Sequence, residues 1–398
     1  MARQRRRLYV CESCIEDEEL QAVVRANLIS NKCDYCQTAN DALMASGIDS
    51  VIQRMRYAVN EVFTDPASEL PYDGREGGYQ GSIIDDSYDL FEQMNFCVEN
   101  AQLLDDLMDE FNGEVLCYRD VFGPSSEEFF EDAWERFKRV VQHQRRYTFW
   151  ESQEDGEHGD PARNVSASEM LPEIGHNIEH VSPILDLPVG EEFWRVQVFE
   201  RGMSSTNPAR YTSPPTDHAN QPNRMSPAGI SMFYGANDFD TAVAETVDPS
   251  TMGGQEATGA RFQTLVALNV LDLSNFYGRR SFFVELDRRG RNAVEFLTAF
   301  NRELSRPIQQ DGRQHIEYVP TQVFTEYVRF RMTMQDEQPI HGIKYRSSRN
   351  GQACFVIFAD QSDCLSNVPE RLRPQLLDFI DGSLRTEIIE SSPNASPL

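Results

Sequence analysis

Four cysteines near the beginning of the chain constrain its fold most strongly. They form two Cys-x2-Cys pairs, separated by 18 residues. Each pair can turn two thiolates toward one metal ion, so two pairs complete the tetrahedral shell of a structural zinc site. Four thiolates leave no open coordination position, and such a metal holds a fold together without taking part in chemistry. We therefore predict a structural Zn2+ bound by Cys11, Cys14, Cys33 and Cys36.

Two other readings of these pairs remain open, a set of redox dithiols or disulfides. Disulfides are rare inside cells, and the arginines of MARQRRRLYVCESC precede no apolar stretch of the kind found in a secretory signal. No run approaches the roughly 18 apolar residues of a membrane span, so we expect a cytoplasmic protein without membrane contact. The other cysteines lack metal-ligand spacing and are expected to be small buried hydrophobes: Cys97, Cys117, Cys354 and Cys364.

Charge divides the chain into two unlike halves. Of 398 residues, 64 are Asp or Glu and 37 are Lys or Arg, which gives a formal net charge of −27. Residues 1–190 hold 38 acids and 16 bases, whereas 191–398 hold 26 acids and 21 bases. This balance argues against non-specific binding to nucleic acid or to an anionic membrane. It leaves the second half able to present a locally positive pocket to an anionic substrate.

Hydrophobic patterning also changes between the halves. The first half is predicted to be mostly helical, whereas residues 151–168 are polar and acidic and indicate a linker. The second half mixes helices with strands rich in aromatic and β-branched residues, so we predict an α+β fold. Helices are expected at 42–63, 84–111, 125–141, 238–247, 290–305 and 321–332, and strands at 193–200, 230–236, 262–273 and 354–360.

Four pieces of the second half carry candidate functional residues: Arg195 in FWRVQ; Arg224, Tyr234 and Glu245 in NRMSPAGISMFYGANDFDTAVAETV; the stretch YVPTQVFTEYVR from residue 318; and Ser347 in GIKYRSSRNG. Each residue has an ordinary structural explanation when it is taken singly. An arginine can sit on an edge strand, a tyrosine can belong to the core, a glutamate can lie on a solvated helix face, and a serine is common in turns.

The joint order of these pieces resembles the RES domain, a family named for its Arg, Glu and Ser. The similarity runs over about residues 180–370 and is carried by Arg195, by R-x5-I-x3-Y-x10-E and by G-I-x-Y-x-S. Many members have proline between the Tyr and Ser of the last motif, where this chain has Arg346. The stretch YVCESCIEDEELQAVV…KCDYCQ resembles the HEPN/RES N-terminal domain that precedes some RES domains.

These resemblances imply five segments: a zinc-binding segment at 8–38, a helical HEPN-like domain at 39–150, a linker at 151–180, a RES domain at 181–370, and a C-terminal helix with a disordered tail at 371–398. They also imply a fold like that of ADP-ribosyltransferases. Family members consume NAD as toxins, by hydrolysis or phosphorolysis of the nicotinamide–ribose bond. NAD is then the substrate, phosphate a possible second one, and an antitoxin or regulatory partner is expected.

The residue types suit that chemistry. Cleavage of the bond develops positive charge on the ribose, and a carboxylate stabilises that charge; Glu245 is the predicted carboxylate. Tyr234 offers a flat face for nicotinamide, and Ser347 a hydrogen bond to the carboxamide or ribose. Arg195 and Arg224 are predicted to bind the pyrophosphate or an incoming phosphate. With nicotinamide a good leaving group, positioning and electrostatics suffice.

Three rival functions remain. The same pocket would serve an ADP-ribosyltransferase that modifies a macromolecule. Arg136 and His143 fit the Arg-x(4–6)-His spacing of HEPN ribonucleases, although a basic helix end explains Arg136 equally well. The third rival is a non-catalytic interaction protein, with the zinc segment and acidic helices recruiting a partner. HEPN domains without nuclease activity are dimerising or regulatory modules, which leaves a homo-oligomer open. Toxin–antitoxin growth control and anti-phage defence are not separated at this level.

Overall fold

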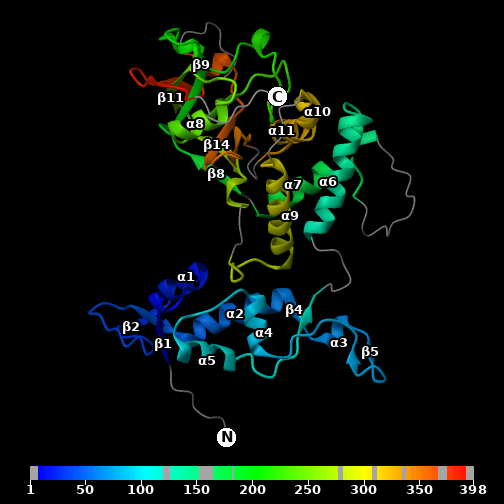
Figure 1. Ribbon diagram of the computed structural model, residues 1–398. Helices are drawn as coiled ribbons and strands as arrows, with labels where there is room; N and C mark the ends of the chain where they lie inside the picture. Colours follow the sequence, from blue (N-terminus) through cyan, green and yellow to red (C-terminus); the bar gives the residue numbers. More distant parts are fainter. Residues whose placement is uncertain are drawn as a thin grey trace. The chain divides into compact units, whose positions relative to one another are not determined.

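The structure, a computed structural model, describes residues 8–119, 126–151, 165–181, 183–276, 281–306, 312–333, 338–365 and 374–390. It divides into two compact units. Unit 1 comprises Met1–Pro124 with Gly278–Asn292, and unit 2 comprises Ser125–Tyr277 with Ala293–Leu398. The chain therefore returns to unit 1 once after leaving it (Figure 1). Helices and strands both contribute substantially, which confirms the predicted α+β class.

Unit 1 begins with a small antiparallel sheet in the order β1-β3-β2. The elements of this first part of unit 1 are β1 (Tyr9–Cys11), the 3-10 turn η1 (Glu12–Cys14), α1 (Glu18–Ala26), β2 (Leu28–Ser30) and β3 (Ala45–Gly47). Helix α1 starts after Asp17, whose carboxylate accepts hydrogen bonds from the backbone N–H groups of Glu19 and Leu20. This side-chain cap satisfies donors that the first turn leaves free. The sheet and α1 thus frame the cysteine-bearing turns.

The rest of unit 1 is mainly helical, with two short strand pairs: α2 (Ile48–Val62), β4 (Phe63–Thr64), α3 (Pro66–Glu69), β5 (Tyr72–Asp73), β6 (Gly78–Tyr79), α4 (Ser87–Gln93), α5 (Ala101–Asp109) and β7 (Cys117–Tyr118). The helical region predicted at 84–111 is two helices. Asn95 adopts a positive φ of 50° after α4. Asn100 then caps α5 by accepting from the N–H of Leu103.

A segment from the second half of the sequence completes the core of unit 1. Phe283 is buried there, with its ring edge-on to Phe96 at 5.1 Å, and Phe282 stacks on Phe63 at 6.1 Å. Arg291 donates to the backbone carbonyls of Phe282, Val284 and Leu286 and holds the segment compact. Residues inside the range expected for the RES domain therefore belong to unit 1 by packing. We call residues 281–287 the anchor segment.

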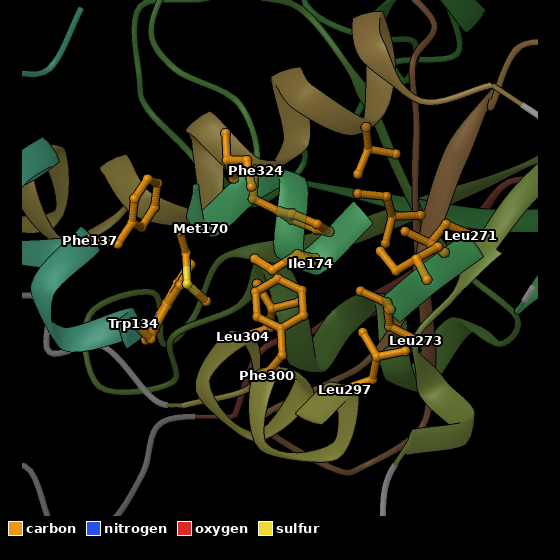
Figure 2. Packing of buried hydrophobic residues seen from close by; sticks show 14 of the residues in the cluster. Trp134, Phe137, Met170, Ile174, Leu271, Leu273, Leu297, Phe300, Leu304 and Phe324 are labelled. Atoms are coloured by element: carbon orange, nitrogen blue, oxygen red, sulfur yellow. The ribbon is translucent and has the colours of Figure 1, made fainter. Parts of the chain in front are cut away.

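Unit 2 contains a helical layer built from both halves of the sequence: α6 (Ser126–His143), the turn η2 (Phe149–Glu151), α7 (Met170–Val181), α9 (Arg288–Leu304), α10 (Gln314–Glu317) and α11 (Val319–Arg331). Figure 2 shows the core shared by α6, α7, α9 and α11, in which Trp134 and Phe137 of α6 lie with Ile174 of α7, Phe300 of α9 and Phe324 of α11. Part of the predicted linker is thus helix α7. Residues 152–164 lie outside the described part of the chain.

A nine-stranded sheet forms the rest of unit 2, in the order β15-β11-β9-β10-β14-β13-β12-β8, with β16 also pairing with β11. The strands are β8 (Ile184–Leu187), β9 (Glu192–Phe199), β10 (Phe233–Ala236), β11 (Glu256–Thr264), β12 (Leu268–Asp272), β13 (Gly342–Arg346), β14 (Ala353–Ile357), β15 (Leu377–Phe379) and β16 (Arg385–Ile388). Short 3-10 turns connect them: η4 (Pro208–Arg210), η5 (Thr216–His218), η6 (Ser274–Phe276) and η7 (Gln361–Cys364).

Near the centre of the sheet, the strands β9 and β10 are joined by a single residue pair among the described residues. Strands β9 and β11 pair continuously from Glu192 to Phe199, whereas β9 and β10 pair only at Trp194 and Ala236 within the described residues. Beyond this residue pair, no backbone pairing between β9 and β10 is described that would keep the two parts of the sheet parallel to each other.

Helix α8 (Phe239–Thr246) packs closely on the centre of this sheet. Gly259 of β11 makes the approach possible, since a Cβ there would lie 2.7 Å from the ring of Phe239. Asp238 caps the helix by accepting from the N–H and the hydroxyl of Thr241. The start of α8 is thereby fixed, and with it the position of Glu245 near its end.

The C-terminal part of unit 2 differs from the prediction. Within 374–390 the chain forms β15 and β16 rather than a helix. Both strands pair with β11, so a distant partner decides their conformation. The tail predicted to be disordered, 391–398, lies outside the described residues. Among the helices that are described, none is both long and apolar enough to cross a bilayer.

Candidate functional site

Ser347 and Glu245 meet at the end of strand β13. The buried Ser347 hydroxyl donates to Oε1 of Glu245 at 2.5 Å and accepts from the backbone N–H of Arg349 at 3.0 Å. Asn350 reaches the same helix through its side-chain amide, which donates to Thr241 Oγ1 at 3.0 Å. The turn after β13 is therefore tied to α8 at two places. Glu245 itself is exposed, so its carboxylate remains accessible to a ligand.

The turn also distinguishes the two adjacent serines. Ser347 is buried and bonded to Glu245, whereas Ser348 is exposed. Arg346, which precedes Ser347, donates to the carbonyls of Ser274 at 2.9 Å and Gly351 at 3.0 Å. These contacts brace the turn from both sides and favour Ser347 as the serine of the site.

Tyr234 and Tyr345 lie on the same face of the sheet as Glu245's helix. Tyr234 faces Val356 across β10 and β14, and Val356 faces Ile343 of β13, two residues before Tyr345. Side chains two apart on a strand share a face. Burial raises the pKa of the Tyr234 hydroxyl to about 12. Burial also raises the pKa of Tyr345, with further contributions from Cys354 and from the negative charge of Glu245.

Arg195 stands on the other face. Trp194 pairs with Ala236 and so shares the face of Tyr234, which turns Arg195 the opposite way. Its guanidinium lies over the ring of Phe233 at 5.3 Å, and Nη1 donates to the backbone carbonyl of Tyr234 at 2.8 Å. Burial lowers its pKa. In this structure Arg195 supports the strand that carries Tyr234, and its buried Nε has no partner among the described residues.

Arg224 is committed to the end of α9. Its Nη2 donates to the carbonyl of Arg306 at 2.8 Å, and Nη1 donates to that of Leu304. A cation at a helix C-terminus is favourable because the last carbonyls lack backbone donors. The guanidinium is still close enough to Tyr345 to lower the pKa of that hydroxyl. Of the five predicted residues, the structure thus joins Ser347 to Glu245 directly, places Tyr234 on their face, and gives both arginines backbone carbonyls as partners.

Three contributors were not identified from the sequence: Ser226, Thr321 and Gln322. Ser226 Oγ lies 2.9 Å from the hydroxyl of Tyr234. Thr321 and Gln322, both buried, bind backbone carbonyls of the turn that contains Ser226. The sequence did contain a signal for Thr321 and Gln322, because they belong to the YVPTQ stretch that was singled out without a role, whereas Ser226 lies in the block that carries Arg224 and Tyr234.

The four predicted metal ligands form a second site, in unit 1. The thiol sulfurs of Cys11, Cys14, Cys33 and Cys36 all lie within 4.8 Å of one another. The Sγ–Sγ distances are 3.7 Å for Cys11–Cys14, 3.6 Å for Cys11–Cys36 and 3.8 Å for Cys14–Cys33. Four sulfurs around a zinc ion at about 2.3 Å form a tetrahedron with edges of about 3.8 Å. The cluster therefore fits a tetrahedral metal, and no disulfide joins these cysteines.

The cysteine turns are joined to the helices of unit 1. Tyr35, between Cys33 and Cys36, donates its hydroxyl to Asp106 Oδ2 at 3.0 Å, and its carbonyl accepts from Asn100 at 3.2 Å. Cys11 and Cys33 are buried in the same core as α2 and α5. A metal at this site would stabilise the whole unit, not the turns alone.

The residues of the possible ribonuclease pair lie two turns apart on α6. Arg136 is partly buried and His143 is exposed. Their helix is packed into the core of unit 2 through Trp134 and Phe137 (Figure 2). A nuclease role for this pair therefore stays a prediction.

Comparison with family models gives two matches. Residues 26–155 match HEPN/RES N-terminal domain 1, and residues 192–379 match the RES domain. The first two cysteines of the metal cluster precede the first matched range, and α6 lies inside it although it packs in unit 2. No curated protein and no solved structure gave a match.

Proposed function

Because this chain is a RES-domain protein with an HEPN/RES N-terminal domain, we propose that its RES domain binds NAD and breaks the nicotinamide–ribose bond by hydrolysis or phosphorolysis. A RES domain indicates a NAD-related, toxin-type function in general. The observation that carries the finer proposal is the hydrogen bond from Ser347 to Glu245, on the face of the sheet that also carries Tyr234. This contact and the shared face support the choice of these three residues.

In this proposal Glu245 stabilises the ribose as its bond to nicotinamide breaks. The bonding electron pair stays on the nicotinamide nitrogen and neutralises the charge of that ring, while positive charge develops on the ribose. A carboxylate beside the ribose lowers the energy of that state. Oxygen from water or phosphate then forms the new bond to the ribose carbon, and the proton of a water nucleophile passes to solvent. Ser347 fixes one carboxylate oxygen and leaves the other for the ribose.

Recognition of the rest of NAD falls to Tyr234 and Arg224. Tyr234 contributes an aromatic face and a hydroxyl that burial keeps protonated. For phosphate groups Arg195 is poorly placed, since its side chain lies on the face of the sheet opposite Tyr234. Arg224 would have to exchange the carbonyls of Leu304 and Arg306 for a phosphate. We therefore propose Arg224 as a phosphate ligand that acts only after this exchange, and Arg195 as a residue that supports the strand of Tyr234.

The first experiment is NAD turnover by the purified full chain, with and without phosphate, with products identified by mass. ADP-ribose as product indicates hydrolysis, and its 1″-phosphate indicates phosphorolysis. We expect Glu245→Gln to lower kcat about 100- to 1,000-fold, the usual cost of losing one electrostatic contribution to a transition state. Asp240→Asn is the matched control, because Asp240 lies on the same helix with an 81% exposed side chain. Equal loss in both variants, or intact NAD with the wild type, would contradict the proposal.

The acceptor is part of the proposal. Transfer of ADP-ribose to a macromolecule needs the same cleavage and a different nucleophile. Labelled NAD incubated with the chain and a cell extract separates the two: label on protein or nucleic acid indicates transfer, and label in free ADP-ribose or its phosphate indicates consumption.

We also propose that Cys11, Cys14, Cys33 and Cys36 hold a structural Zn2+. The support is their tetrahedral separation and the absence of a disulfide among them. Four thiolates would close the coordination shell and leave the ion no role in NAD chemistry.

Finally, we propose that unit 1 restrains or triggers the RES domain, alone or with a separate antitoxin. The support is that one continuous helix belongs to both units. Helix α9 begins in unit 1, next to the anchor segment, and ends in unit 2 at Leu304. Arg224 binds the carbonyl of Leu304. Phe283→Ala should therefore change the NAD turnover of the full chain. Unchanged turnover in a variant that remains folded would leave restraint to a separate protein.

A further inference from the structure

A four-residue turn, Asn223–Ser226, lies against Tyr234 and is held in place by side chains of α11. The turn is closed by backbone hydrogen bonds between Asn223 and Ser226 in both directions, at 2.8 and 3.3 Å. Gln322 donates its amide to the carbonyls of Asn223 at 2.8 Å and Ser226 at 3.3 Å. Thr321 donates to the carbonyl of Arg224. We call this segment the 223–226 turn.

The side chains that hold the turn are buried, which makes their bonds informative. Gln322 is 7% exposed and Thr321 is 6% exposed. Burial of a polar side chain costs free energy unless it is hydrogen-bonded. An apolar residue at these positions of α11 could be buried without this cost in free energy. Their bonds go to backbone carbonyls, so they fix the path of the turn whatever its side chains are.

The 223–226 turn places the hydroxyl of Ser226 next to the hydroxyl oxygen of Tyr234. Ser226 Oγ lies 2.9 Å from it, and the amide of Asn223 approaches Ser226 Oγ at 3.5 Å. Ser226 and the backbone of Met225 both act to lower the pKa of Tyr234, against the larger effect of burial. Because the Asn223 amide donates to Ser226 Oγ, we take the Ser226 hydroxyl as the donor to the Tyr234 oxygen. With its oxygen occupied as an acceptor, the phenol O–H is left to donate elsewhere.

We propose that the 223–226 turn orients the Tyr234 hydroxyl so that it donates a hydrogen bond to an acceptor atom of the substrate, and that Gln322 and Ser226 are the positioning residues that maintain this direction. The inference rests on the proposed function for the identity of the substrate. In NAD the acceptor would be an uncharged oxygen, of the carboxamide or the ribose, because a neutral phenol held in a fixed direction suits such an atom.

The test combines kinetics with a double-mutant cycle in the full chain. Ser226→Ala should lower kcat/KM for NAD about 10- to 100-fold, since misplacement of a group by about 1 Å has effects of this size. Ser226→Thr, which keeps the hydroxyl, should restore most of the loss. Tyr234→Phe should cost little more in the Ser226→Ala background, because both changes remove the same donor to substrate.

The matched control is Ser231→Ala. Ser231 is also buried in the loop before β10, but its hydroxyl donates to the carbonyl of Pro214 at 2.6 Å and does not contact Tyr234. The inference is overturned if Ser231→Ala costs as much as Ser226→Ala, or if the losses from Ser226→Ala and Tyr234→Phe multiply.

A second measurement is independent of NAD chemistry. Hydrogen exchange of the peptide containing the amide of Ser226 should be faster in Gln322→Ala than in the wild type, because the turn loses two of its bonds to α11. Unchanged exchange overturns the positioning role of Gln322. Faster exchange in a chain that leaves NAD intact would retain the positioning device and reject the proposed substrate, so the two failures are distinguishable.

Discussion

At the scale of single residues, Ser347 and Ser348 show how much one position matters. Ser347 is 3% exposed and bonded to Glu245, whereas the side chain of its neighbour faces solvent. We expect Ser347→Ala to lower kcat for NAD cleavage about 10-fold, because an isolated carboxylate keeps its charge but loses its orientation. Ser348→Ala is the control and should leave kcat unchanged. A larger effect at Ser348 would show that Ser348, not Ser347, is the serine of the site.

Tyr234 gives a prediction about pH. Its pKa of about 12 lies above that of a free tyrosine, so the hydroxyl stays protonated throughout pH 6–10. The rate of NAD cleavage should therefore show no decline with a midpoint near pH 10. Between pH 10 and 12 the unfolded chain releases this proton while the folded chain keeps it, so Tyr234 makes the unfolding free energy fall as pH rises. An alkaline limb near pH 10 that disappears in Tyr234→Phe would contradict the assignment.

Residue types could be predicted from the sequence, but their directions could not. The spacing of Tyr234, Glu245 and Ser347 singled out three residues that lie on one side of the sheet. Arg195 fitted the same motif and faces the other way. A strand tells which residues alternate, but not which of its faces carries a site. Gln322 was overlooked because its role depends on carbonyls 96 and 99 positions away in the sequence.

At the scale of secondary structure, prediction succeeded where the pattern is local. Helices expected at 238–247 and 290–305 are α8 and α9 at Phe239–Thr246 and Arg288–Leu304. Strands β15 and β16 were missed because each is short and is defined by pairing with β11, more than 100 residues earlier. The anchor segment was missed for the same reason, since its aromatic residues read equally well as core of either unit.

The cysteine turns give a prediction at this scale. Cys33→Ser should lower the zinc content from one ion per chain and lower the melting temperature of unit 1, because binding of a structural zinc ion supplies folding free energy. Cys97→Ser is the control, since Cys97 lies outside the cluster and is exposed, so the expectation that it is buried was wrong. Zinc content by mass spectrometry of the native chain checks the first statement, and calorimetry checks the second. Equal zinc content in both variants would exclude the site.

At the scale of the whole molecule, the packing determines where the chain can be cut. A fragment of residues 181–398 contains the predicted RES domain but lacks α6 and all but the last residue of α7. Phe130, Trp134 and Phe137 of α6 are buried in the core of unit 2. We expect that fragment to aggregate, because loss of α6 exposes a large apolar surface. A fragment of 126–398 retains α6 and should be more soluble, although it leaves Phe283 without the core of unit 1. Recovery of both fragments after centrifugation checks the expectation; equal solubility would show that α6 is dispensable.

The return of the chain to unit 1 also sets an order for its synthesis. Ribosomes add roughly 5–20 residues per second, so about 160 residues and roughly 10–30 s separate the emergence of Pro124 from that of Phe283. The core of unit 1 remains incomplete until Phe283 has been synthesised. Ser347 is added later still, so a nascent chain can complete unit 1 before it contains all the residues that we propose to act on NAD. If unit 1 restrains the RES domain as we propose, the restraining unit is therefore synthesised before the domain that it restrains.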